Sequence, residues 1–328
     1  MSEAIIAVDL GGTRIRAARL SQSLEIEARE ETLTETERGI DYTLERFKSM
    51  VRAVWPTDGT PITGIGVSSP GPLNPMTGVI VAPPNLKGWH NVPLGDILHE
   101  TFGVPVYVGN DANVAALAET VMGAAQGCRH VIYITVSTGI GSGMIIDGKM
   151  LLGKNGLGAE AGHIIIQSSP EQVRLELETA GPALALQAKA RIEAGEQSVI
   201  TDMVNGDLSQ ISGATVGKAA KANDRLALAV VHEAGRVLGL GMVSLLHLFN
   251  PEILVFGGGV SDNLGELLFA PMRESIQKYC IDDSYWQDLR IESAALGENV
   301  SIFGAAALVV TQGGLTDVNE AIAHLKTV

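Results

Sequence analysis

Cysteine is scarce in this sequence. The chain of 328 residues contains 2 cysteines, Cys128 and Cys280, which lie far apart and lack the spacing of a metal site. The opening residues, 1–12, carry no basic stretch ahead of an apolar core, so no export signal is predicted. We therefore expect the protein in a reducing compartment, the cytoplasm.

Positive charge is also in short supply. The chain has 23 Lys and Arg against 37 Asp and Glu, for a net charge of −14. Such a surface repels a phosphate backbone, so nucleic acid is not an expected partner. Long uncharged apolar runs are missing as well, because residues 226–249 are interrupted by His232, Glu233 and Arg236. A charged side chain at the centre of a bilayer costs roughly 2.5–3.5 kcal/mol, so we predict a core helix here and no membrane partner.

Aromatic residues make up only 4% of the chain, whereas 46% is hydrophobic and 38 residues are glycine. This composition is typical of an α/β protein whose sheets are covered by helices and whose glycines lie in tight loops. The length favours about two domains. Residues 4–20 read as a strand, a Gly-Gly turn and a second strand, and residues 130–152 repeat this plan. We therefore predict duplicated domains with a ligand site in the cleft between them.

The pattern between and after these hairpins predicts the remaining elements of the first domain. They are a third strand at 24–33, a helix at 43–55, strands at 62–69 and 104–111, and a helix at 112–125. Residues 70–94 form a long connection rich in Pro and Gly. Interleaved apolar residues argue that this loop is ordered, and its length predicts that it is functional.

Two glycine turns are candidates for phosphate binding. Residues 9–14 offer the Asp9 carboxylate, which can hold hydrated Mg²⁺, two glycines that let an anion approach the backbone, and the Thr13 hydroxyl. Residues 137–143 offer hydroxyls and glycines but no carboxylate. Each turn by itself is equally consistent with a tight hairpin, and the matched pair favours phosphate. The glycines at 257–259 suit either a nucleotide base lying on the backbone or a simple strand-to-helix turn.

Several polar side chains could bind or activate an alcohol. Asn110 and Asp111 stand where a strand meets a helix, which alone favours a routine N-cap. Asp111 could also accept the proton of an attacking alcohol while Asn110 holds a neighbouring hydroxyl. Glu160, His163 and Glu176 suit sugar hydroxyls, although any one of them alone would be ordinary loop charge. Zinc is disfavoured, because neither cysteine nor a second histidine lies near His163 in sequence.

Taken together, the motifs resemble the ROK family of sugar kinases, and the whole chain is similar to its bacterial glucokinases. The matching segments are AVDLGGTRIRAARL, VSSPGPLNPMTGVIVAPPNLKGWHNVPL, VGNDANVAALAE, ITVSTGIGSGMIIDGKMLLGKNGLGAEAGHI, LFNPEILVFGGGVS and FGAAAL. The resemblance implies an actin/hexokinase-type, ribonuclease H-like fold of duplicated α/β domains closing on ATP and a hexose. We expect a small domain over 1–112, with residues 302–328 packed back on it, and a larger domain over 113–301.

The resemblance also implies roles for individual residues. It places the catalytic base at Asp111. It places the sugar against Gly71, Asn85, Asn110, Asp111, Glu160, His163 and Glu176. It places ATP against Asp9, Gly11, Gly12, Thr13, Arg14, Thr138, Gly139, Gly257, Gly258 and Gly259, with Asp9 holding Mg²⁺ through water. Arg14 stands where the family usually has lysine.

The chain departs from the family after His163. A cysteine-rich zinc motif usually follows there, and residues 167–176 contain no cysteine, so zinc is not expected. We expect packing of residues 164–166 and Leu175 to order this loop instead. Without the motif, the alignment leaves either Glu176 or Glu178 as the residue that faces the sugar.

The expected reaction is transfer of the ATP γ-phosphoryl group to a hexose, with O6 of glucose favoured. Mannose, fructose, allose and N-acetylhexosamines remain alternatives. A non-catalytic sugar sensor is the other class, since the family includes repressors with a DNA-binding module ahead of the kinase-like body. The first strand begins near Ile5 and the chain is acidic, which argues against such a module. A homodimer is expected from the resemblance.

Overall fold

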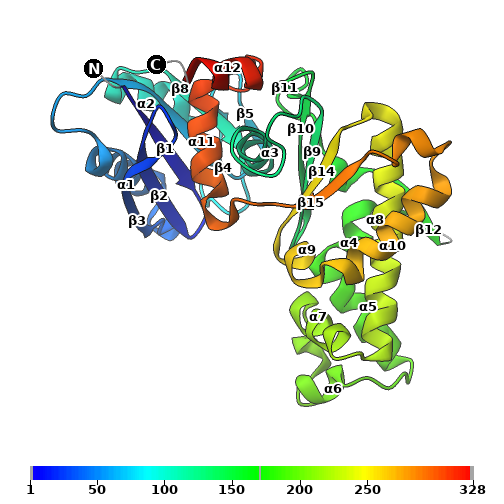
Figure 1. Ribbon diagram of the computed structural model, residues 1–328. Helices are drawn as coiled ribbons and strands as arrows, with labels where there is room; N and C mark the ends of the chain where they lie inside the picture. The colour runs from blue at the N-terminus through cyan, green and yellow to red at the C-terminus, as the bar shows by residue number, and fades with distance from the viewer. Residues whose placement is uncertain (1–2, 170, 326–328) are drawn as a thin grey trace. The chain divides into compact units, whose positions relative to one another are not determined.

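The computed structural model describes residues 3–169 and 171–325 (Figure 1). By their internal contacts, the residues divide into two compact units. The first unit comprises Met1–Val131, Gly143–Ala159 and Ala294–Val328, and the second comprises Ile132–Ser142 and Glu160–Ser293. This division differs from the predicted boundaries at residues 112 and 301, since residues 113–131 and 143–159 fall in the first unit.

The first unit is built on a five-stranded sheet of order β3-β2-β1-β4-β8. Its strands are β1 (Ala4–Leu10), β2 (Arg14–Ser21), β3 (Ile26–Leu33), β4 (Ile62–Ser69) and β8 (Val106–Asn110). The first three strands form an antiparallel meander, as predicted, while β4 runs parallel to β1 and β8 runs parallel to β4. Because β1, β4 and β8 are parallel, their carboxyl ends lie at one edge of the sheet.

The helices of the first unit pack against this sheet or against one another and supply the rest of the core. They are α1 (Ile40–Val54), α2 (Leu94–Phe102), α3 (Asp111–Val121), α11 (Val300–Val310) and α12 (Val318–Leu325), with short 3₁₀ turns at η1 (Thr36–Arg38) and η5 (Gly297–Asn299). Helix α1 buries Phe47, Val51 and Val54 along one face, the spacing of an amphipathic helix. Helix α11, from the end of the chain, contacts β1, β4 and α3 (Figure 1).

The long connection at 70–94 is ordered. It contains the short antiparallel strands β5 (Leu73–Asn74), β6 (Val79–Ile80) and β7 (Val92–Pro93). Leu86 and Trp89 are each 1% exposed, and they belong to the core of the first unit. Burial of these side chains offsets the entropy cost of ordering so long a loop.

A second five-stranded sheet has the order β11-β10-β9-β14-β15. Its strands are β9 (Val131–Val136), β10 (Ile140–Ile146), β11 (Lys149–Met150), β14 (Ile253–Gly257) and β15 (Arg290–Ser293). Counted along the chain, these strands occupy the same places as those of the first sheet. The antiparallel pairing of β10 with β11 and the parallel pairing of β14 with β15 also match. The predicted duplication is thus present.

The second unit, which contains β14, β15 and most of β9, is otherwise mainly helical. Its remaining elements are η2 (Ala161–His163), β12 (Ile165–Ser169), β13 (Glu171–Arg174), α4 (Leu175–Thr179), α5 (Gly181–Glu193), α6 (Ile200–Met203), η3 (Leu208–Gln210), α7 (Gly213–Lys221), α8 (Arg225–Phe249), α9 (Gly259–Leu264), α10 (Glu266–Tyr279) and η4 (Asp283–Tyr285). By length and composition, α8 could cross a membrane, but 67% of its apolar window is buried in the fold. Helices α4, α5, α7 and α10 pack on it, which confirms the predicted core helix.

Candidate active site

The first glycine turn is tightly held between β1 and β2. The N–H of Gly11 donates to the carbonyl of Arg14 at 2.8 Å. The hydroxyl of Thr34 donates to the carbonyl of Gly11 at 2.6 Å, and its N–H donates to the carbonyl of Thr13 at 2.8 Å. Thr34 is fully buried. Sequence reasoning missed Thr34, because its partner is a backbone group more than twenty positions earlier.

Gly12 brings this turn against the long connection. A Cβ atom built on Gly12 would lie 2.6 Å from the carbonyl oxygen of Asn85 and 2.9 Å from its Cβ. Such distances exclude any side chain at position 12 unless the backbone moves. The structure therefore places Asn85, a predicted sugar residue, directly beside the predicted phosphate turn.

Asp9 is paired with a cation that the sequence analysis overlooked. Its Oδ2 lies 3.0 Å from Nη2 of Arg16, the residue directly opposite on β2. Burial raises the pKa of Asp9 above its ordinary value, the charge of Arg16 opposes this rise, and the negative charge of Asp111 adds to it. Arg14, predicted to bind the nucleotide, has a side chain 58% exposed and pairs with Glu31.

Asn110 and Asp111 lie at the junction of β8 and α3. The Oδ1 of Asn110 accepts the N–H of Asn113 at 2.8 Å, so this side chain is the N-cap of α3 and retains its amide N–H groups as donors. Asp111 is exposed, and its Oδ1 accepts the N–H of Ala112 at 2.8 Å. Partial desolvation by the surrounding protein nevertheless raises the pKa of Asp111. A Cβ built on Gly71 would lie 3.9 Å from that of Asn110.

The predicted groups of the first unit thus share one neighbourhood. Asp9 and Asn110 stand at the carboxyl ends of β1 and β8, which flank β4 at the same edge of the sheet. This edge is where ligands bind in many open α/β sheets.

In the second unit, Glu176 contacts the second glycine turn. Its Oε2 accepts the N–H of Ile140 at 2.9 Å, and a Cβ built on Gly139 would lie 2.6 Å from the same oxygen. The turn itself is closed by a 2.9 Å bond from the N–H of Ser137 to the carbonyl of Gly139. Thr138, at its tip, is exposed.

Glu160 and His163 lie next to this turn through η2. The N–H of Ala161 donates to the hydroxyl of Ser142 at 2.8 Å, which fixes η2 on β10. Glu160 and His163 are both exposed. Nη1 of Arg174 donates to Nδ1 of His163 at 3.3 Å, a contact that assigns the proton of a neutral imidazole to Nε2.

Strands β12 and β13 form an antiparallel hairpin where the family motif would bind zinc. Leu175 is fully buried and Ile166 is 8% exposed, as the packing prediction requires, but Ile165 is 61% exposed and does not take part. In an antiparallel hairpin successive side chains face opposite sides, which explains why Ile165 and Ile166 differ. Among the described residues, no three His, Cys, Asp or Glu side chains converge as metal ligands.

The glycines at 257–259 connect β14 to α9. Gly258 has φ of +93°, and a Cβ there would lie 2.6 Å from Oγ1 of Thr135. Both the backbone conformation and the close approach to β9 require glycine at this position. Thr135 precedes the second glycine turn by two residues, so the predicted nucleoside and phosphate segments of this unit are neighbours.

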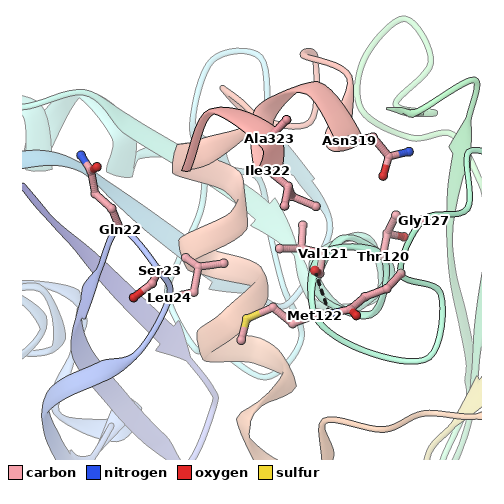
Figure 2. Close-up of a pocket in the computed structure, with 11 residues that line it drawn as sticks. Gln22, Ser23, Leu24, Thr120, Val121, Met122, Gly127, Asn319, Ile322 and Ala323 are labelled. Carbon is pink, nitrogen blue, oxygen red and sulfur yellow. Dashed lines mark hydrogen bonds between the residues drawn. The ribbon is translucent and has the colours of Figure 1, made fainter. Parts of the chain in front are cut away.

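Described residues of the first unit also line cavities of about 500 and 530 Å³. The 500 Å³ cavity lies between the end of α3, the β2–β3 turn and α12 (Figure 2). Thr120, which lines it, is roughly 14 Å along α3 from Asp111, at 1.5 Å per residue. The 530 Å³ cavity is lined by residues of the long connection, α2 and the chain after α11. Neither cavity is lined by a predicted site residue.

The chain is similar in sequence and structure to known sugar kinases. The sequence profile of the ROK family matches residues 5–312. The glucokinase of Thermotoga maritima is 32% identical over 310 residues, 93% of this chain and 96% of that protein. The structure of a ROK family glucokinase from Streptomyces griseus, in complex with glucose and AMPPNP, is 31% identical with a TM-score of 0.72. This match covers 93% of this chain and 98% of that one.

A repressor is also similar over part of its length. The xylose repressor of Caldicellulosiruptor bescii is 31% identical over 256 residues, which cover 76% of this chain and 63% of the repressor. The structural matches confirm the predicted actin/hexokinase-type α/β fold.

Proposed function

This chain belongs to the ROK family, and on that premise we propose that it transfers the γ-phosphoryl group of ATP to a hexose, at O6 of glucose. The observation that carries the proposal is the exposed, desolvated carboxylate of Asp111, next to the N-capping Asn110 and at the same sheet edge as the turn that contains Asp9. The similarity of this chain to glucokinases, over nearly their whole length, supports the same reaction.

In this reaction the sugar hydroxyl attacks the γ-phosphorus, and the bond from that phosphorus to the leaving oxygen of ADP breaks. Asp111 accepts the proton of the hydroxyl, and a carboxylate with a raised pKa is the stronger base for this step. The N–H groups of Asn110 remain available to donate to a neighbouring sugar oxygen. The backbone of the glycine turns holds the phosphates.

Asp9 fits the expected magnesium role. Oδ2 of Asp9 pairs with Arg16, and no described residue forms a hydrogen bond or ion pair with Oδ1. Mg²⁺ in nucleotide sites is bound by one or two carboxylates together with phosphates and water, so a cluster of three protein ligands is not required. When bound, Mg²⁺ would neutralise phosphate charge. Asp9 would hold its hydration shell.

We assign sugar recognition to Glu160, His163 and Glu176 of the second unit, together with Asn85 and Gly71 of the first. Glu176 is preferred to Glu178 because its carboxylate contacts the second glycine turn. His163 would donate through Nε2, and the carboxylates would accept from sugar hydroxyls. The proposal includes a cytoplasmic location and a homodimer. Size-exclusion chromatography with light scattering would test the dimer.

A panel of hexoses with ATP and Mg²⁺ tests the reaction, with ADP release as the readout. We expect the highest kcat/KM with glucose, and an Asp111→Ala variant should lose turnover while it still binds glucose. A different preferred hexose would change the substrate and keep the reaction class. The similarity to the xylose repressor favours a sugar sensor as the second candidate. Sugar binding without phosphorylation of any hexose would establish it.

A further inference from the structure

Arg16 joins two parts of the first unit. In the antiparallel pairing of β1 with β2, Asp9 and Arg16 are directly opposite, so both side chains leave the same face of the sheet. Nη2 of Arg16 lies 3.0 Å from Oδ2 of Asp9, and the side chains are 25% and 14% exposed. Nη1 of Arg16 donates to the carbonyl of Glu298 at 3.1 Å. One guanidinium thus connects the acid of the phosphate turn to η5.

The segment that Arg16 reaches is itself fixed within the first unit. Nη1 of Arg29, on β3, donates to Oδ1 of Asn299 at 2.9 Å. The N–H groups of Ala295 and Leu296 donate to the buried carboxylate of Glu119, on α3, at 2.9 and 3.1 Å. Arg16 therefore has a rigid support on the side away from Asp9, and its planar guanidinium has little freedom to rotate.

We propose that Arg16 is a positioning residue that orients the Asp9 carboxylate toward the hydrated Mg²⁺ of the nucleotide. This inference rests on the proposed kinase function, since it assigns Arg16 to the same phosphate site. A guanidinium held at two points fixes the plane of the carboxylate that it binds. Its charge also offsets the repulsion between Asp9 and Asp111. The unengaged oxygen of Asp9 is then presented in one orientation.

An ordinary structural ion pair is the competing explanation, and β2 supplies a matched control. Arg19 lies on the same strand, its side chain is also 25% exposed, and its Nε lies 3.0 Å from Oε2 of Glu27. Arg16 and Arg19 are three residues apart, so they face opposite sides of the sheet. If ion pairing on β2 mattered only for folding, Arg16→Met and Arg19→Met should behave alike.

The test measures nucleotide binding by calorimetry, with AMPPNP as a non-hydrolysable probe, in the presence and absence of Mg²⁺. We expect Arg16→Met to weaken binding of Mg²⁺·AMPPNP by about tenfold or more, equivalent to about 1.4 kcal/mol. Metal-free AMPPNP and glucose should bind within about threefold of wild type. Arg16→Lys keeps the positive charge but lacks the planar guanidinium, so it should recover only part of the lost Mg²⁺·AMPPNP affinity. Arg19→Met should match wild type throughout.

Steady-state kinetics gives the second readout. Arg16→Met should raise KM for Mg²⁺·ATP and lower kcat, with KM for the sugar unchanged. Equal Mg²⁺·AMPPNP affinity in Arg16→Met and Arg19→Met would overturn the proposal, whatever their melting temperatures. If Arg16→Met does not fold, Arg16→Lys and Arg16→Gln provide the same comparison. A wild type that binds Mg²⁺·AMPPNP and phosphorylates no hexose would refute the kinase function alone, whereas absence of nucleotide binding would refute both.

Discussion

Glu119 offers the sharpest test of how the first unit is held together. This glutamate on α3 is fully buried, and three backbone N–H groups donate to it. Oε2 accepts from Ala124 at 2.8 Å, and Oε1 accepts from Ala295 and Leu296 at 2.9 and 3.1 Å. Glu119 thereby fixes the end of the helix that begins with Asp111 to the segment that leads into α11.

The isosteric change Glu119→Gln removes one acceptor and adds a donor. Whichever way the amide is turned, its NH₂ group faces at least one buried N–H. A hydrogen bond to a charged group contributes roughly 1.5–3 kcal/mol, so we expect a loss of about 2–3 kcal/mol. Melting temperature changes by roughly 2–4 °C per kcal/mol in domains of 150–250 residues, which gives a decrease of about 4–12 °C. Glu119→Ala removes all three bonds and should cost more.

Differential scanning calorimetry measures this loss, and amide hydrogen exchange locates it. Exchange at Ala124, Ala295 and Leu296 should accelerate in Glu119→Gln. The control is Glu45→Gln, on α1, whose side chain is 65% exposed and whose ion pair with Lys48 lies on the surface. Surface changes of this kind usually stay within about 0.5 kcal/mol. If Glu119→Gln melted within about 1 °C of this control, the three backbone bonds would not stabilise the unit as argued.

Three further predictions concern the site itself. Asp111→Asn should lower kcat by about 10²–10⁴. Because burial raises the pKa of Asp111 in the folded state, ionising it destabilises the protein as pH rises above the ordinary value near 3.8. The Asp111→Asn variant should therefore melt at a higher temperature than wild type at pH 7, and this difference should vanish near pH 3. A difference in melting temperature that did not change with pH would contradict a raised pKa of Asp111. Gly12→Ala places a methyl group 2.6 Å from the carbonyl of Asn85, so calorimetry should show a loss of about 1–3 kcal/mol and kinetics a higher KM for ATP. Glu176→Gln keeps an acceptor for the N–H of Ile140 but loses the charge, so KM for glucose should rise about tenfold with little change in melting temperature; an unchanged KM would remove Glu176 from the sugar site.

Local pattern was enough to predict most of the elements. The strand expected at 62–69 is β4 (Ile62–Ser69), and the helix expected at 112–125 is α3 (Asp111–Val121), because apolar periodicity and N-capping are local signals. Contacts between distant segments could not be read in the same way. The approach of Gly12 to Asn85 depends on how a long connection folds over the sheet, and no short-range pattern encodes it.

The pairing of Asp9 with Arg16 lies between these cases. Both residues flank one hairpin, and the register that places them opposite each other follows once the turn is known. From the sequence, Arg14, two residues after Gly12, is assigned to nucleotide binding, and Arg16 is not singled out. In the hairpin, Arg14 pairs across the sheet with Leu33 of β3, and its side chain contacts Glu31. Strand register, rather than proximity in sequence, decides which arginine meets the acid.

The two acids at this sheet edge differ in a way that composition cannot reveal. Asp9 lies near the end of β1 and Asp111 directly follows β8, and desolvation raises the pKa of both. Arg16 opposes the rise at Asp9, whereas only backbone N–H groups oppose it at Asp111. The guanidinium beside Asp9 favours the charged form of that carboxylate, which suits a hydrated metal. Among the described residues no cation pairs with Asp111, which leaves its carboxylate available to accept a proton, as a general base must. The proposed division of roles therefore follows from their neighbours, because the two side chains are chemically identical.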